Sequence, residues 1–297
     1  MAVRILTVAL AVALTGCSLV SRVGVRFLYR KADLLSTQII RDICYLPSSA
    51  CDGPENTLDL YLPITGRWPV IVFVHGGGWD SGDKDFRAGG ADVYANVGRY
   101  YASRGIAVAV INYGLQPRVT WSQQVDDVRT AVSWVRSRAL DYGGQPDHLF
   151  LMGHSAGAHL ASLVALTANA QMRLAIRGVI AVSGAALDLA DETTYQLGAD
   201  RHYYAERFQH GDATDEWKRR ASPVRYVSPQ SPPFLILYAT GETRALQHQS
   251  QLLHAELEKH GVSSRLVPVP GESHTRIVLA LSHPDKVPAR EILEFVQ

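Results

Sequence analysis

A lone serine between two glycines is the clearest chemical feature of the sequence. The stretch MGHSAGAH covers residues 152–159, directly after the apolar run HLFL. It fits the pattern G-x-S-x-G, in which a strand turns so sharply into a helix that side chains at the glycine positions would clash. The strained turn raises the Ser155 hydroxyl above the sheet, and the start of the helix directs backbone N–H groups toward an oxyanion formed there. These features predict that Ser155 is a nucleophile.

A serine hydroxyl needs a neighbouring base before it attacks a substrate. For a nucleophile on this kind of turn the chain order is serine, acid, histidine, with the histidine after the last strand. Among 11 histidines, His274 in VPVPGESHTRI meets that condition, and His283, which Pro284 follows, is the alternative. His154 neighbours the serine, but the sharp turn should direct its ring elsewhere, and it is a candidate pocket residue. The order therefore predicts His274 as the base.

The acid that orients this histidine should lie in the loop after the expected strand PFLILYAT. No aspartate occurs from residue 216 to residue 284, so the candidates are glutamates. Glu272 lies only two residues from the histidine, and Glu256 and Glu258 belong to an expected helix. Glu242 remains, and triads of this type accept either Asp or Glu. The alternative for Glu242 is an ordinary solvated carboxylate in a loop.

A second glycine cluster continues an apolar, β-branched run. The segment VHGGGWDSG covers residues 74–82. Successive glycines let the main chain approach a substrate closely. We expect the N–H groups of Gly77, Gly78 and Ala156 to form an oxyanion hole, and the alternative is a plain glycine-rich turn. Trp79 is a candidate pocket wall, for which the alternative is packing in the core.

Strand-like and helix-like segments alternate along most of the chain. Strands are expected at residues 56–63, 69–75, 106–113, 148–153, 176–184, 233–241 and 264–271, and helices at 92–105, 121–144, 156–170, 246–261 and 288–296. Such alternation predicts the α/β class, with a mostly parallel central sheet and helices on both faces. Residues 185–230 break the alternation with many Asp, Tyr, Arg and His residues and no clear strand. A segment of this length predicts a cap-like insertion.

The first residues differ in kind from the rest. Arg4 precedes the apolar stretch ILTVALAVAL, which is too short to span a bilayer comfortably, and small residues follow it. The pattern predicts a secretory signal over residues 1–16, a tether over 17–42 and a catalytic domain over 43–297. The ending LTGC resembles a bacterial lipobox, which implies a lipid on Cys17 and a place in the cell envelope, anchored at the outer membrane or periplasmic side, or secretion. The alternatives are an ordinary signal peptide or an uncleaved anchor.

Two further cysteines and the overall charge narrow the setting. Cys44 and Cys51 flank YLPSSA and could form a disulfide in an oxidising compartment, or remain two thiols. They are too few and too poorly spaced for a zinc site without histidines. The formal net charge is +1 and no long basic run occurs, which argues against nucleic acid as a partner.

Several motifs together suggest a family. VHGGGW, INYGL, GHSAGAHLA, PPFLILYATGE and GESHTRI resemble the α/β-hydrolase esterases of the hormone-sensitive-lipase-like and feruloyl-esterase-like (BD-FAE-like) group. The segment GETRALQHQS is also similar to kynurenine formamidases, in which an acid precedes a comparable segment. The resemblance implies an α/β-hydrolase fold and hydrolysis of a small-molecule carboxylic ester through an acyl-enzyme. It places Ser155, His274 and Glu242 in the catalytic triad and implies no metal or organic cofactor.

Two other functions are compatible with parts of the same residue pattern. An amidase or formamidase would use the same triad, and only assays separate it from an esterase. A non-catalytic envelope binding protein is the other alternative, because a fold alone does not decide function. The complete set of serine, glutamate, histidine and glycine loop argues against that alternative.

Overall fold

The computed structural model describes residues 29–32, 37–47, 51 and 53–297. The signal peptide predicted over residues 1–16 and the lipidation predicted at Cys17 lie outside these residues. No helix in the described part of the chain is both long enough and apolar enough to cross a membrane.

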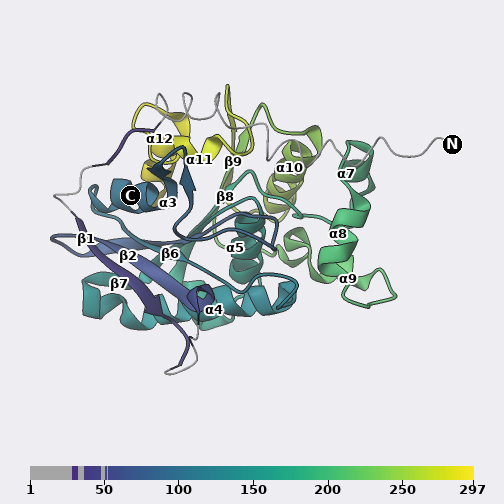
Figure 1. Ribbon diagram of the computed structural model, residues 1–297. Helices are drawn as coiled ribbons and strands as arrows, with labels where there is room; N and C mark the ends of the chain where they lie inside the picture. Colours follow the sequence, from purple (N-terminus) through teal and green to yellow (C-terminus); the bar gives the residue numbers. More distant parts are fainter. Residues whose placement is uncertain (1–28, 33–36, 48–50, 52) are drawn as a thin grey trace.

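One central sheet organises the described residues (Figure 1). Its eight strands lie in the order β1-β2-β6-β3-β7-β8-β9-β10. From β6 to β10 the neighbouring strands are parallel, whereas β2 runs antiparallel to both β1 and β6. The strands are β1 (Thr37–Cys44), β2 (Thr57–Pro63), β3 (Trp68–Val74), β6 (Ala107–Ile111), β7 (Gly144–His154), β8 (Ile176–Val182), β9 (Phe234–Ala239) and β10 (Ser264–Val269), and a separate ribbon pairs β4 (Arg87–Ala88) with β5 (Ala91–Asp92). The mostly parallel sheet expected from the sequence is confirmed.

Helices cover both faces of this sheet. α3 (Val93–Ala102), α11 (Ile277–Ala280) and α12 (Val287–Val296) bury apolar side chains against one face. α4 (Trp121–Arg138), α5 (Ala156–Leu166) and α10 (Arg244–Lys259) cover the other face, with the short α6 (Ala170–Ala175) and the 3₁₀ turns η1 (Pro54–Asn56) and η2 (Ala139–Tyr142) in the connections. The strand β3 shows the cause, because Val70 to Val74 are β-branched or aromatic and at most 3% exposed, as strands buried on both faces require.

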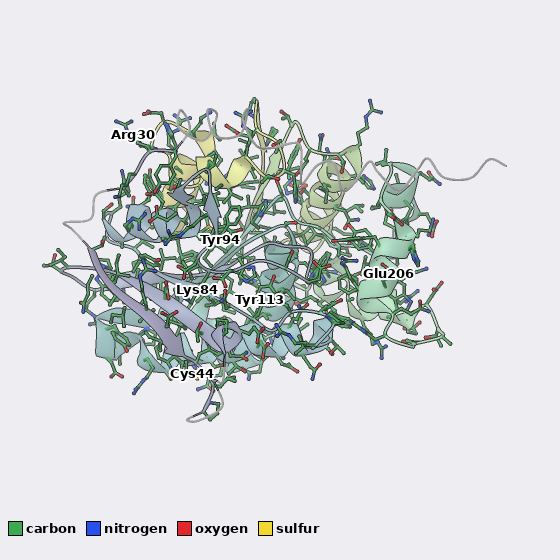
Figure 2. All side chains as sticks on the ribbon, viewed as in Figure 1. Arg30, Cys44, Lys84, Tyr94, Tyr113 and Glu206 are labelled. Atoms are coloured by element: carbon green, nitrogen blue, oxygen red, sulfur yellow. A yellow bond between two sulfur atoms is a disulfide. The ribbon has the colours of Figure 1, made fainter. Side chains whose placement is uncertain are left out.

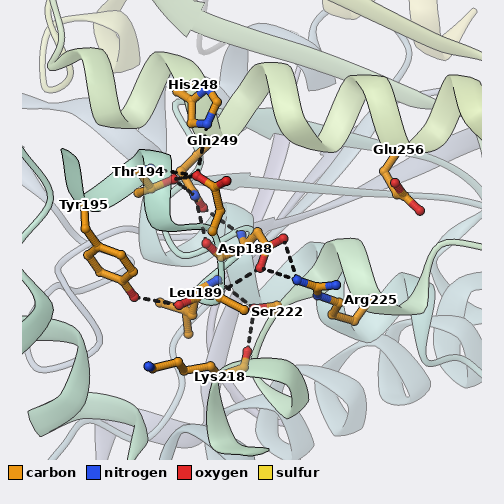
Figure 3. A network of polar contacts seen from close by, with 12 residues as sticks. Asp188, Leu189, Thr194, Tyr195, Lys218, Ser222, Arg225, His248, Gln249 and Glu256 are labelled. Carbon is orange, nitrogen blue, oxygen red and sulfur yellow. Dashed lines mark hydrogen bonds and ion pairs between the residues drawn. The ribbon is translucent and has the colours of Figure 1, made fainter. Parts of the chain in front are cut away.

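Between β8 and β9 the chain leaves the sheet and forms a helical cap, on the right in Figure 1. The cap consists of α7 (Glu192–Gln196), α8 (Arg201–Phe208), α9 (Glu216–Arg220) and the 3₁₀ turn η3 (Pro223–Tyr226). Polar contacts fix its base (Figure 3): the Gln249 side chain on α10 accepts from the Asp188 N–H at 2.7 Å and donates to the Asp188 carbonyl at 2.9 Å. The insertion expected over residues 185–230 is therefore a set of short helices anchored on α10.

The domain begins earlier in the chain than the sequence predicts. Residues 37–42, assigned above to a tether, belong to β1, which pairs with β2 at the edge of the sheet. Residues 29–32 also contact the domain, since the Ala32 N–H donates to the Asn96 side chain at 2.8 Å. The tether prediction was wrong here because β1 is a half-exposed edge strand, and its residues show no continuous apolar run.

A disulfide and ion pairs to a buried lysine attach β1 to its neighbours. The structure joins Cys44 to Cys51, with their Cα atoms 5.9 Å apart. The Lys84 side chain, labelled in Figure 2, is 2% exposed, and its Nζ lies 2.8 Å from the Asp59 carboxylate and 2.6 Å from that of Asp42. Burial alone would lower the pKa of Lys84, but the hydrogen bonds to these two carboxylates raise it above its usual value. The lysine is therefore charged and ties β1 to β2.

Candidate active site

The serine lies at the tip of the turn between β7 and α5. Ser155 has a φ of 55° and a ψ of −119°, a strained backbone for a residue with a side chain. A Cβ atom on Gly153 would stand 2.2 Å from the Gly157 carbonyl oxygen, and one on Gly157 would stand 2.1 Å from the Val74 carbonyl oxygen. Both glycines are therefore required by space, and the tight turn that they allow leaves Ser155 half-buried at the carboxyl end of the sheet.

The loop after β10 brings a histidine to this serine. His274 Nε2 lies 2.9 Å from Ser155 Oγ, although 119 positions separate the two residues. On the other side of the ring, Nδ1 lies 3.0 Å from Glu242 Oε2. A carboxylate only accepts hydrogen bonds, so Nδ1 carries the proton and Nε2 presents its lone pair to the serine hydroxyl. The structure thus brings together the three residues that the sequence predicts.

The acid comes from the loop after β9, and backbone bonds hold that loop against the histidine loop. The Glu242 side chain is 0% exposed, while that of His274 is 30% exposed. The Gly241 N–H donates to the Glu272 carbonyl at 3.0 Å, and the Thr240 N–H donates to the Val269 carbonyl at 3.1 Å. These bonds position the carboxylate and the imidazole as one unit.

The alternative base and acid lie elsewhere. His283 interacts with its own neighbour, accepting from the Asp285 N–H at 3.3 Å. Glu272 pairs with a lysine instead, its carboxylate lying 2.9 Å from Lys286 Nζ. Glu256 and Glu258 both lie on α10, as expected from the sequence.

His154 supports the histidine loop. The sequence predicts that its ring points away from the serine hydroxyl, and the structure shows what it contacts instead: Nε2 donates to the His274 carbonyl oxygen at 2.7 Å. The two imidazole rings lie 5.0 Å apart. Complete burial, with a smaller contribution from the nearby His274, lowers the pKa of His154 to about 3, so the ring is neutral. Its other nitrogen, Nδ1, has no partner among the described residues.

The glycine loop after β3 lies directly against the serine turn. A Cβ atom on Gly76 would stand 3.3 Å from Ser155 Cβ and 2.8 Å from His154 Nδ1. Within the described chain, the N–H groups of Gly77, Gly78 and Ala156 donate no hydrogen bond to backbone or side chain. Unpaired N–H groups beside a serine hydroxyl are what an oxyanion hole requires.

Trp79 lies in the core rather than on an open wall. It is 1% exposed, and its Nε1 donates to His159 Nδ1 at 3.2 Å. The other ring nitrogen of His159 donates to the Ala221 carbonyl at 2.7 Å, so this histidine links the glycine loop, α5 and the cap. Trp79 therefore packs in the core and is not an open pocket wall. No three His, Cys, Asp or Glu side chains gather as a metal site in the described residues.

The parallel sheet, the serine turn and the hydrogen-bonded histidine and glutamate define an α/β-hydrolase. More narrowly, the chain belongs to the BD-FAE family, because the model of that family matches residues 58–257, more than half of the chain. The family expected from the motifs is confirmed. The similarity to kynurenine formamidases stays a prediction.

Individual relatives agree with this membership. Esterase LipQ of Mycobacterium tuberculosis is 30% identical over 268 residues, covering 86% of this chain and 61% of that protein. Probable isoprenylcysteine alpha-carbonyl methylesterase ICMEL1 of Arabidopsis thaliana is 29% identical over 256 residues, covering 77% of this chain and 50% of that protein. The chain therefore spans about half to three fifths of the length of these curated relatives. Among solved structures, esterase B from Lactobacillus rhamnosis matches with a TM-score of 0.73 at 24% identity, over 97% of this chain and 93% of that one, which is a likeness of fold.

Proposed function

We propose that the chain is a serine carboxylesterase that hydrolyses small or short-chain carboxylic esters through an acyl-enzyme. One observation carries the proposal, the unbroken hydrogen-bonded chain from Glu242 through His274 to Ser155, with distances of 3.0 Å and 2.9 Å. Nucleophile, base and orienting acid in hydrogen-bond reach are the arrangement that activates a serine. The printed names of the relatives, an esterase and a probable methylesterase, support the same reaction class.

The reaction follows from the roles of these groups. His274 Nε2 takes the hydroxyl proton as Ser155 Oγ attacks the ester carbonyl, and the buried carboxylate of Glu242 stabilises the imidazolium that forms. The unpaired N–H groups of Gly77, Gly78 and Ala156 receive the developing oxyanion. The imidazolium then protonates the leaving alcohol. Water, activated by the same histidine, hydrolyses the acyl-enzyme and restores the serine.

The test is a chain-length series of p-nitrophenyl esters, from acetate to octanoate, with wild type and two serine variants. Ser155→Ala should lower kcat by about 10³-fold or more, because it removes the nucleophile. Ser162→Ala is the matched control, since Ser162 lies on the same helix, is 0% exposed and has no partner in the described chain. The proposal is wrong if Ser155→Ala hydrolyses these esters as fast as the control.

N-formyl substrates in the same series test the amidase or formamidase alternative. The segment resembling kynurenine formamidases contains Gln249, and this side chain binds the Asp188 backbone and the Thr194 hydroxyl at the base of the cap. The segment therefore has a structural use, and it does not by itself favour an amide substrate. Faster turnover of N-formyl compounds than of every ester would make the formamidase reaction the primary one.

The cellular setting is part of the proposal. The residues Arg4 to Cys17 support export and a lipid on Cys17, and the Cys44–Cys51 disulfide fits an oxidising compartment. Mass spectrometry of the mature N-terminus, in bacteria expressing wild type or Cys17→Ala, tests this. A diacylglycerol mass on Cys17 in wild type supports the anchor. An unmodified N-terminus in the membrane fraction contradicts it.

A further inference from the structure

One arginine of the cap binds the backbone of the glycine loop. Arg207 lies at the end of α8, next to Glu206, which Figure 2 labels. Its Nε donates to the Gly78 carbonyl oxygen at 2.9 Å, and its Nη2 pairs with the Asp80 carboxylate. The guanidinium lies 3.6 Å from the ring centroid of Tyr203, and the side chain is only 15% exposed. Three contacts on different sides therefore fix the guanidinium.

The end of α8 is itself held in place. The Gln116 side chain donates to the Arg207 carbonyl at 3.0 Å, and the Trp121 ring donates to the Phe208 carbonyl at 3.1 Å. The ring of Phe208 also packs against Trp79, with centroids 4.9 Å apart. The arginine thus extends from a rigid support, and its hydrogen bond transmits the position of the cap to the loop.

The glycine loop needs such support because its residues do not define their own conformation. Gly77 has a φ of 128° and Gly78 a φ of 61°, values that glycine adopts freely and also leaves freely. Each N–H lies in the same peptide plane as the preceding carbonyl, so the direction of the N–H groups depends on what binds these carbonyls.

Each of the three glycine carbonyls in the loop accepts a hydrogen bond from a different residue. The Gly76 carbonyl accepts from His75 Nδ1 at 2.7 Å, and the Gly77 carbonyl accepts from the Ser81 N–H at 3.0 Å and the Ser81 hydroxyl at 2.7 Å. These donors belong to the loop or to its start. The Gly78 carbonyl accepts instead from Arg207, a residue of the cap. This bond fixes the peptide plane between Gly78 and Trp79, which carries the Trp79 N–H. The planes that carry the Gly77 and Gly78 N–H groups are bound within the loop, so Arg207 acts on these donors indirectly, by fixing the end of the glycine run.

We propose that Arg207 is a positioning residue that holds the oxyanion loop through the Gly78 carbonyl, so that cap helix α8 and the loop act as one unit. This inference rests on the proposed esterase function for its effect on rate. The arginine side chain donates to the Gly78 and Tyr203 carbonyls and to Asp80, and to neither Ser155 nor His274 within the described chain, so it acts through the loop and not on the reacting atoms.

The molecule supplies a matched control on the same helix. Arg201 lies at the start of α8, pairs with the Glu192 carboxylate and stacks at 4.0 Å over the ring of Tyr195. It repeats the ion pair and the stacking of Arg207 without a contact to the glycine loop. Arg207→Met and Arg201→Met therefore remove the same kinds of contact and differ in whether these contacts reach the glycine loop, which Arg207 binds at the Gly78 carbonyl and at Asp80.

The first measurement is steady-state kinetics, with the concentration of active enzyme determined by active-site titration. Arg207→Met should lower kcat for p-nitrophenyl acetate by about 10- to 100-fold with little change in KM, because loosening an oxyanion donor costs less than deleting it. Arg201→Met should keep most of the wild-type kcat. Arg207→Lys, which retains one donor and the charge, should recover a large part of the loss. A rise in KM at unchanged kcat, or equal kcat in the two methionine variants, overturns the proposal.

Hydrogen exchange gives a second measurement that needs no turnover. The Ser81 amide donates to the Gly77 carbonyl and reports opening of the loop. Its exchange should be faster in Arg207→Met than in wild type or Arg201→Met, and equal exchange in all three contradicts the proposal. Absence of ester hydrolysis by wild type would instead contradict the proposed function, while the exchange rates would still decide whether Arg207 holds the loop.

Discussion

At Glu242, a buried carboxylate has a single visible partner. Its side chain is 0% exposed, and its second oxygen, Oε1, has no hydrogen-bond partner among the described residues. The contact that remains is the bond from His274 Nδ1 to Oε2. Because a carboxylate cannot donate, it selects the tautomer that leaves Nε2 free to take a proton from Ser155. Glu242 therefore contributes both its negative charge and its choice of the imidazole tautomer. A substitution that keeps the shape of the side chain tests these two contributions.

We expect Glu242→Gln to lower kcat by about 10³- to 10⁴-fold, because the amide donates to Nδ1 and holds the imidazole in the wrong tautomer. The substitution nearly conserves volume, so the chain should still fold, and circular dichroism and the urea midpoint should stay close to wild type. Steady-state hydrolysis of p-nitrophenyl acetate, corrected for titrated sites, measures the loss.

Glu272→Gln is the control for this prediction. Glu272 lies two residues before His274, but its carboxylate is directed to Lys286 at 2.9 Å. Its substitution should cost stability and retain most of kcat. If Glu242→Gln keeps more than about a tenth of the wild-type kcat, Glu242 is not the acid that orients the histidine.

Single residues of the site could be found from the sequence where chain order or local sterics define them. The glycines around Ser155 are required by a turn of five residues, and His274 and Glu242 follow from their order after particular strands. The contact that His154 makes, and Arg207 altogether, could not be found in this way. Their partners, the His274 and Gly78 carbonyls, lie 120 and 129 positions away and are backbone atoms that carry no sequence signal.

Among the elements, β1 depends most on its covalent attachment. It is one of the two edge strands of the sheet, half-exposed along its length, and only β2 pairs with it. The Cys44–Cys51 bond closes a short loop between the end of β1 and the segment before β2. In the chain-entropy account, a disulfide that closes a loop of this size stabilises the folded state by about 2 kcal/mol.

We expect Cys44→Ser/Cys51→Ser to lower the free energy of unfolding by about 2 kcal/mol, measured by urea unfolding of the oxidised wild type and the double variant. Strand β1 lies four places from β7, which carries the serine turn, so kcat for ester hydrolysis at low urea should stay near wild type. Wild type treated with a reductant should behave like the variant. Equal stability of oxidised and reduced wild type would show that the edge strand is held by its other contacts alone.

As with the residues, the sequence predicts some elements of the fold and not others. The strands β3 and β6 are apolar along their whole length because both faces are covered, and β8 is apolar from Val179 to Val182; such runs are visible in the sequence. The pairing of β1 and the docking of the cap depend on contacts such as Gln249 with Asp188, between residues 61 positions apart. Local patterns therefore predict the centre of the sheet and leave its edge and its cap open.

At the scale of the whole molecule, three histidines are folded into the interior around the site. His75, His154 and His159 have pKa values lowered to about 4, about 3 and about 4, in each case chiefly by complete burial. Each donates a hydrogen bond to a carbonyl, which a neutral imidazole can do. The folded chain therefore excludes protons that the unfolded chain would bind.

Acid should consequently unfold the protein at a higher pH than protonation of its carboxylates alone would require. Unfolded histidines titrate near pH 6.5, so between about pH 6.5 and 4 unfolding takes up protons, and the free energy of unfolding falls by about 1.4 kcal/mol per pH unit for each buried histidine. This stability is fully present above pH 6.5 and is lost as the pH falls toward the folded-state pKa values. The carboxylates with lowered pKa, Asp92, Asp191 and Asp212, contribute only at lower pH.

The slope of the unfolding free energy against pH tests this directly, because it counts the protons taken up. Between pH 6 and 5 we expect uptake of about two to three protons by the wild type and about one fewer in His159→Gln, whatever the absolute stability of that variant. His202→Gln is the control, since His202 is 82% exposed and stays in water whether the chain is folded or not. A flat stability profile down to about pH 4.5 would mean that the buried rings accept protons without unfolding, which their carbonyl contacts and lack of exposure do not allow.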